Sequence, residues 1–296
     1  MNSSMKARLR TFLQQVAPEL FNWYKSYHLH HYYRKRFGRL QNSARQLFYA
    51  GGQPRILSGP FAGMVYLDET VWGPVTPKWL GCYELELHDI VEAAIACRYD
   101  RVIDVGCAEG YYAVGFAWRM PEAEIITFDI DPIARRQTRR LAAMTGVSTK
   151  VRVNNECGWA DLNHLISDRT LVLVDVEGYE STLLSLEDVP GLKKADLLVE
   201  IHEEHGAGCT NAVEQAMRER FQDTHLLTWR RSLDRKSSVE QFASLWKGKI
   251  NEEEFCAMLD EGRPVPQVWL WATTKHLAGS QLPRSTLATG PSNRQL

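Results

Sequence analysis

The sequence lacks a long apolar run, an excess of charge of either sign and any paired cysteine motif. No stretch approaches the roughly 18 to 20 apolar residues of a transmembrane helix, and residues 1–20 lack the apolar core of a signal peptide. The formal net charge of -1 argues against a generic nucleic-acid binder. The six cysteines include no C-x-x-C pair and no histidine at zinc-ligand spacing. We therefore expect reduced thiols, a cytoplasmic location and no transmembrane segment.

The length and composition are those of an ordinary globular protein. With 296 residues, 44% of them hydrophobic and 24% charged, the chain can form one main domain with an accessory region. We expect an N-terminal helical extension and connecting segment over 1–80, and the main domain over 81–277. The polar residues 278–296, rich in Ser, Pro and Gly, are expected to be disordered.

The N-terminal region has few helix breakers up to residue 50 and many after it. We expect helix over 1–50, where the aromatic and basic run Phe21–Phe37 packs against the main domain more readily than it binds a membrane surface. Between 51 and 80, Gly and Pro recur, so turns and short strands such as Met64–Leu67 are expected.

From Tyr83 onward, helical and strand patterns alternate, which predicts right-handed βαβ units and a parallel sheet. Leu171–Val174 and Leu197–Val199 are apolar throughout, as in central strands covered on both faces. The last two strands, Thr224–Trp229 and Val268–Thr273, are expected to pair antiparallel around an insertion at 230–267. The expected earlier elements are a helix after Tyr83, then strands and helices at 101–105, 111–120, 124–129, 132–144, 150–153, 171–176 and 196–201.

The segment Asp104-Val-Gly-Cys-Ala-Glu-Gly110 falls where a strand turns into a helix. Gly106, Ala108 and Gly110 lack bulk where a ligand would approach the backbone. The helix starting near Tyr111 offers free N–H groups to a carboxylate, and Asp104 could pair with an amino group. These features suit the amino-acid end of a ligand, namely the methionine part of S-adenosylmethionine.

A dinucleotide fingerprint is absent, because Ala108 and Tyr111 occupy two of the positions that G-x-G-x-x-G reserves for glycine. Asp129 follows the second strand about 20 residues later, where a carboxylate accepts hydrogen bonds from ribose hydroxyls. Asp131 is expected to cap the next helix. After the third strand, Glu156 and Cys157 are candidate adenine contacts, or part of a polar loop only.

Four segments together resemble one family. Asp104–Gly110, Phe128–Pro132, Asp175-Val-Glu-Gly-Tyr-Glu180 and Leu198-Val-Glu-Ile-His202 resemble the FkbM-type branch of class I S-adenosylmethionine-dependent methyltransferases, over roughly Tyr83 to Glu204. The resemblance implies a Rossmann-like α/β fold, S-adenosylmethionine as cofactor, and a hydroxyl acceptor on a small molecule, sugar or lipid-linked glycan. Asp129-Ile-Asp-Pro132 and Leu173 depart from the Glu-Pro and Lys common in the family.

Residues and resemblance together define a candidate cofactor site. We expect it to contain Asp104, Gly106, Cys107, Ala108, Gly110, Tyr111, Asp129, Ile130, Glu156, Cys157 and Asp175.

Polar residues also end the two apolar central strands, where ligands of open α/β sheets collect. If both strands stay extended, Asp175 and Glu177 share one face, as do Glu200 and His202. Methyl transfer to a hydroxyl needs a base, so His202, Asp175 and Glu177 are the candidate catalytic residues. The same groups could instead form a structural network or hold a divalent cation, and no metal ligand is assigned.

Two other functions fit parts of the sequence. One is a catalytically silent cofactor-binding or scaffold protein that associates through the aromatic N-terminal run. The other is a nicotinamide-dependent oxidoreductase that binds NAD despite the missing glycines. The acceptor, the methylated atom and the oligomeric state are left open.

Overall fold

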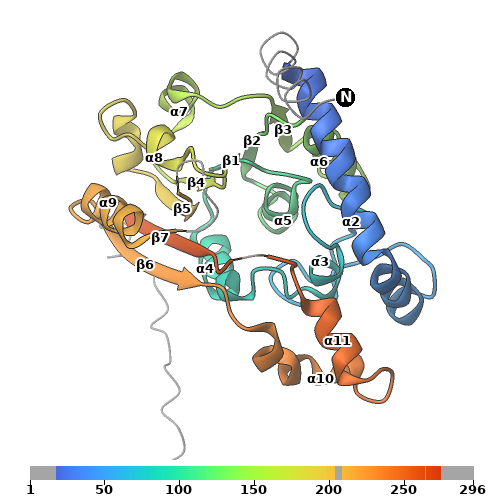
Figure 1. Cartoon of the computed structure of the whole chain (residues 1–296). Coiled ribbons are helices and arrows are strands. Elements are labelled where there is room, and N and C mark those ends of the chain that lie inside the picture. Colours follow the sequence, from blue (N-terminus) through green and yellow to red (C-terminus); the bar gives the residue numbers. More distant parts are fainter. Residues whose placement is uncertain (1–17, 204–208, 264, 275–296) are drawn as a thin grey trace, which may run out of the picture.

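The computed structural model describes residues 18–203, 209–263 and 265–274, and Figure 1 shows their arrangement. Within these ranges, no helix combines the length and apolar character needed to span a membrane. The expected disordered tail at 278–296 and the first 17 residues lie outside the described residues.

The helices lie mostly where the hydrophobic pattern predicts them. The α-helices are α2 (Pro18–Tyr49), α3 (Thr76–Leu80), α4 (His88–Cys97), α5 (Tyr111–Arg119), α6 (Pro132–Thr145), α7 (Trp159–Leu165), α8 (Glu180–Leu183), α9 (Asn211–Phe221), α10 (Ala243–Trp246) and α11 (Glu252–Leu259). The short 3₁₀ helices are η1 (Leu85–Leu87), η2 (Pro190–Lys193) and η3 (Arg235–Phe242).

One sheet with the order β3-β2-β1-β4-β5-β7-β6 forms the centre of the fold. Strands β1 to β5 pair parallel, whereas β7 pairs antiparallel with both β5 and β6. This confirms the predicted fold class, a mainly parallel Rossmann-like sheet with a C-terminal antiparallel pair. The strands are β1 (Arg101–Val105), β2 (Glu124–Phe128), β3 (Val151–Asn154), β4 (Thr170–Val174), β5 (Asp196–Glu200), β6 (His225–Arg231) and β7 (Val268–Thr274).

Helices cover both faces of the sheet, as in a doubly wound fold. Alternate residues of β1 enter different cores: Val102 belongs to the cluster that contains Val91 and Phe116, and Ile103 belongs to a second cluster that contains Leu162. All five residues of β4 and of β5 are buried. Their continuous apolar runs therefore mark central strands, as expected.

The N-terminal segment contributes to the main core. Helix α2 packs against α6 and α11 (Figure 1), with Phe37 and Ala44 buried, whereas Tyr24, Tyr27 and Tyr32 are about half exposed. The predicted packing of the aromatic run is thus confirmed only towards its C-terminal end.

The stretch between α2 and α4 is more tightly built than its turns suggest. Tyr66 and Trp79 are fully buried in the core shared with the sheet. The expected strand Met64–Leu67 is wrong, because only one isolated bridge forms there, between Arg55 and Val65. The domain boundary near residue 80 stays a prediction.

The insertion at 230–267 folds back onto the start of the main domain. Arg235 lies between Glu86 and Glu261, donating to Glu86 at 2.9 Å. Because Glu86 and Glu261 are buried, this ion pair holds the insertion against η1.

Candidate functional site

The parallel sheet brings the predicted site residues to one edge. The loops after β1, β2, β3 and β4, and the end of β5, all lie at the carboxyl ends of neighbouring strands. Asp104 stands between Thr127 of β2 and Leu173 of β4 in the register. Ligands of open α/β sheets bind at this edge.

The loop after β1 packs directly onto the loop after β4. A Cβ added to Gly106, which has φ +89°, would lie 1.7 Å from the carbonyl oxygen of Asp175. A Cβ on Gly110 would lie 2.9 Å from Cγ2 of Thr138. At both glycines the protein's own atoms occupy the space that a Cβ would take, so packing alone requires glycine there. The expected approach of a ligand to this backbone stays a prediction.

The carboxylate of Asp104 is buried with little compensation. The residue is 1% exposed, and neither oxygen makes a well-formed hydrogen bond within the described parts of the chain. Burial, and next the charge of Asp129, raise the pKa of Asp104 to about 7, whereas the nearby backbone N–H of Ala113 in α5 lowers it. An uncompensated buried carboxylate is costly, so this position favours a cationic ligand group, such as an ammonium.

Asp129 joins the first two loops of the site. One carboxylate oxygen accepts the N–H of Ala108 at 2.9 Å, and the other accepts the N–H of Asp131 at 2.7 Å. Burial raises the pKa of Asp129 to about 7. Each oxygen keeps a further lone pair for a ribose hydroxyl. Ile130 follows with its side chain 60% exposed, an apolar surface beside the carboxylate.

Other predicted cofactor residues take up different surroundings. Tyr111 is buried in an aromatic cluster with Phe61 and Tyr83, so only its backbone can face a ligand. Cys107 is buried beside Thr138. Cys157 lies in the core on the sheet face covered by α7, and burial raises its pKa to about 12.

Glu156, which precedes Cys157, is exposed. Of the two predicted adenine contacts, only this side chain faces away from the core. Asp131 caps α6 as predicted, accepting the N–H of Ile133 at 2.8 Å.

Glu109 lies within the first motif but is not among the predicted site residues. Glu109 is fully buried and pairs with the buried Lys78. It also accepts hydrogen bonds from the Tyr66 hydroxyl at 3.0 Å and the Val71 N–H at 3.1 Å. The loop after β1 is thereby anchored to the segment before α4. Only its position inside the motif could have drawn attention to it.

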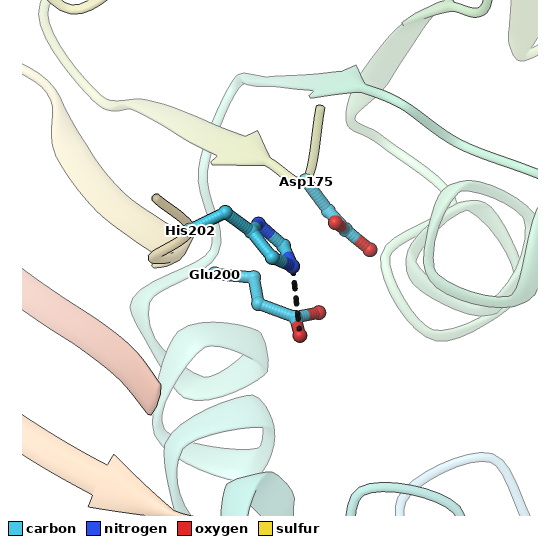
Figure 2. Close-up of side chains that lie close together, drawn as sticks. All are labelled: Asp175, Glu200 and His202. Carbon is cyan, nitrogen blue, oxygen red and sulfur yellow. Dashed lines mark ion pairs between the residues drawn. The ribbon is translucent and has the colours of Figure 1, made fainter. Parts of the chain in front are cut away.

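Three polar side chains meet at the ends of β4 and β5: Asp175, Glu200 and His202 (Figure 2). Nε2 of His202 lies 3.3 Å from Oε1 of Glu200. One atom from each residue falls within 4.8 Å of the others. The expected convergence of Asp175 with Glu200 and His202 is confirmed.

Glu177 stands differently from the prediction. Strand β4 ends at Val174, and Glu177 has a left-handed backbone with φ 54°. The prediction that Glu177 and Asp175 share one face of an extended strand is therefore wrong, because the chain leaves the extended conformation before Glu177. Its side chain is 67% exposed, with Oε2 3.7 Å from Nε2 of His202.

Glu180 holds His202 from the other side. Oε1 of Glu180 lies 2.9 Å from Nδ1 of His202, and the same carboxylate accepts N–H groups of Val176 and Gly178. Burial lowers the pKa of His202, but the hydrogen bonds to Glu180 and Glu200 raise it to about 11. With both ring nitrogens facing carboxylates, His202 is poorly placed to accept a proton.

The carboxylate of Asp175 has fewer hydrogen-bond partners than that of Glu180. Its Oδ1 is buried without a hydrogen-bond partner in the described ranges. Burial, and next the charge of Glu200, hold the pKa of Asp175 well above its usual value.

Arg263, a further residue the sequence reasoning missed, reaches this cluster from the insertion. It pairs with Glu84, with Glu261 at 2.9 Å and with Glu200 at 3.5 Å. It also donates to the Tyr83 hydroxyl at 3.0 Å. No local pattern identifies this residue, since Glu84 lies 179 positions away.

Two cavities lie elsewhere. One of about 300 Å³ is lined by Ser58, His88 and Phe242 among others, and one of about 790 Å³ by Asp89, Trp229 and Arg231 among others. Neither is lined by a predicted cofactor or acceptor residue.

No protein-family model matches the sequence, and no curated protein matches it. Among solved structures, the O-methyltransferase TomG from Streptomyces achromogenes, in complex with SAM, is similar over 61% of this chain and 76% of its own, with 13% identity and a TM-score of 0.41. The C-terminal domain of precorrin-6Y C5,15-methyltransferase from Rhodobacter capsulatus is similar over 64% of this chain and 86% of its own, with 13% identity and a TM-score of 0.37.

A third similar structure is precorrin 8W decarboxylase from Methanobacterium thermoautotrophicum. It covers 64% of this chain and 90% of its own, with 15% identity and a TM-score of 0.40. The fold assignment rests on the strand order and pairing described above.

Proposed function

We propose that the protein is an S-adenosylmethionine-dependent methyltransferase of the FkbM-type branch that methylates a hydroxyl group. The observation that carries the proposal is the buried carboxylate of Asp104, neither oxygen of which makes a well-formed hydrogen bond to a described residue, at the start of the loop leading into α5. A single ligand with an ammonium and a carboxylate satisfies both Asp104 and the N-terminus of that helix.

The remaining cofactor contacts follow from the sheet edge. Asp129 would accept hydrogen bonds from the ribose hydroxyls, and the exposed side chain of Ile130 would pack against the adenine. Glu156 would lie at its rim. The loop backbone from Gly106 to Gly110 would line the methionine end. When bound, the cofactor supplies an electrophilic methyl group on a sulfonium.

The acceptor hydroxyl would lie at Asp175, beside the methionine end of the cofactor. We propose Asp175 as the base, because its Oδ1 is buried without a partner in the described ranges, whereas His202 already faces two carboxylates. His202 would then hold Asp175 and Glu200 in place, and Glu177 would stand at the rim. The acceptor class, a small molecule, sugar or lipid-linked glycan, follows from the family resemblance.

Transfer of a labelled methyl group tests this function. The purified protein is incubated with methyl-labelled S-adenosylmethionine and with polar and lipid extracts, and label is followed into each fraction. We expect label in a base-stable methyl ether, lost with Asp175→Asn and kept with Asp168→Asn, an exposed control at the opposite edge of the sheet. Cofactor binding without label in any fraction would contradict the activity and support the silent cofactor-binding alternative.

A further inference from the structure

The cluster at the ends of β4 and β5 contains buried carboxylate oxygens that accept no hydrogen bond from the described residues. Glu200 is 1% exposed, yet its Oε2 has no hydrogen-bond partner in the described residues. Oδ1 of Asp175 is in the same situation. Buried oxygens without partners are uncommon, because each loses its hydration without compensation.

The unsatisfied oxygens of Asp175 and Glu200 lie close to the imidazole of His202. Figure 2 shows Asp175, Glu200 and His202 pointing towards one small region, and the atoms they offer lie within 4.8 Å of one another. Ligand atoms about 2.1 Å from one cation lie roughly 3 to 4 Å apart. A small adjustment of the side chains therefore brings the three around one ion.

The histidine is also oriented as metal-binding histidines are. Nδ1 of His202 faces the buried carboxylate of Glu180 at 2.9 Å, which directs Nε2 towards Glu200. A carboxylate behind one ring nitrogen orients the ring for metal binding through the other, so a cation at this site would replace the proton that Nε2 shares with Glu200.

The local charge favours a cation as well. Asp175, Glu177, Glu180 and Glu200 surround the site, and Arg263, which reaches Glu200 at 3.5 Å, also pairs with other carboxylates. Four carboxylates thus face two cationic side chains, His202 and Arg263, so the cluster has an excess of carboxylates even with the His202 ring charged.

We propose that Asp175, Glu200 and Nε2 of His202 bind one divalent cation, held in orientation by Glu180. Two carboxylates with one imidazole suit first-row ions such as Mn²⁺. Under the function proposed above, the ion would bind the acceptor oxygen and favour its deprotonation, while the second oxygen of Asp175 accepts the proton. Metal binding itself does not depend on that function.

Titration with Mn²⁺ tests the site. The full chain is freed of metal with a chelator, and free Mn²⁺ is followed by electron paramagnetic resonance. We expect one ion per chain, with affinity reduced at least about 10-fold by Glu200→Gln, by Asp175→Asn and by His202→Ala. The controls Glu187→Gln and His164→Ala, both at exposed positions, remove the same charge or ring and should keep the wild-type affinity.

A second readout identifies the ligand nitrogen. Electron spin-echo modulation should report nitrogen bound to Mn²⁺ in the wild type and in His164→Ala, and none in His202→Ala. Absence of binding, or equal affinity in all five variants, would overturn the proposal. Titration of the same samples with S-adenosylhomocysteine separates the two claims, because a protein that binds Mn²⁺ but not this ligand has the metal site without the proposed function.

Discussion

Substitution of Gly106 by alanine tests the packing that holds the two central loops of the site together. The new Cβ would lie 1.7 Å from the carbonyl oxygen and 2.7 Å from the carbonyl carbon of Asp175. Both are backbone atoms, so rotation of a side chain cannot relieve the overlap. The loop after β4 must move, which strains the hydrogen bond from the Asp175 N–H to Val105.

The magnitude follows from three contributions. A non-glycine residue at positive φ costs about 1–2 kcal/mol, overpacking about 1–3 kcal/mol, and a weakened hydrogen bond up to about 1 kcal/mol. We expect Gly106→Ala to lower the free energy of unfolding by roughly 2–6 kcal/mol, a large part of typical domain stability.

Gly146 provides a matched control. It ends α6 with φ +79°, and a Cβ there would meet no atom within 4 Å. Gly146→Ala should therefore cost only about 1–2 kcal/mol from the backbone strain. Urea unfolding of both variants gives the difference. Equal losses of stability would refute the close contact between the Gly106 and Asp175 loops.

Two further predictions concern buried charges. Lys78→Met leaves Glu109 buried without its ion-pair partner and should lower the free energy of unfolding by about 3–5 kcal/mol. Its control Lys247→Met, at an exposed pair with Glu240, should cost at most about 1 kcal/mol. Similar melting temperatures of the two variants would contradict this prediction. Burial raises the pKa of both Asp104 and Asp129 to about 7. Because an ammonium ligand needs the Asp104 anion, protonation of Asp104 by itself should lower the affinity for S-adenosylhomocysteine by up to about tenfold per pH unit below 7. Asp104→Asn should flatten this dependence in calorimetric titrations, and an unchanged slope would contradict the assigned contact.

The fold could be predicted because its signals are local. The apolar runs at Leu171–Val174 and Leu197–Val199 mark central strands, and all seven expected strands after Tyr83 form within about two residues of their predicted ends. Met64–Leu67 failed as a strand because strand formation needs a partner, and only Val65 finds one, in a single bridge.

The site could be predicted in part. The topology places Asp104, Asp129, Asp175 and His202 at one edge, because the carboxyl ends of parallel strands meet there. The turn at Glu177 could not be foreseen, since a left-handed backbone is rare for a residue other than glycine.

Ion pairs between residues far apart in the sequence could not be predicted either. Lys78 pairs with Glu109 across 31 positions, and Arg263 with Glu84 across 179. Periodicity and spacing carry no information about pairs that tertiary folding alone brings together.

Calorimetric titration with S-adenosylhomocysteine tests the central claim most directly. We expect one site per chain in the wild type, with affinity lowered at least about 10-fold by Asp129→Ala, which removes the carboxylate assigned to the ribose. NAD should not compete. Absence of binding of both S-adenosylmethionine and S-adenosylhomocysteine, or displacement by NAD, would contradict it.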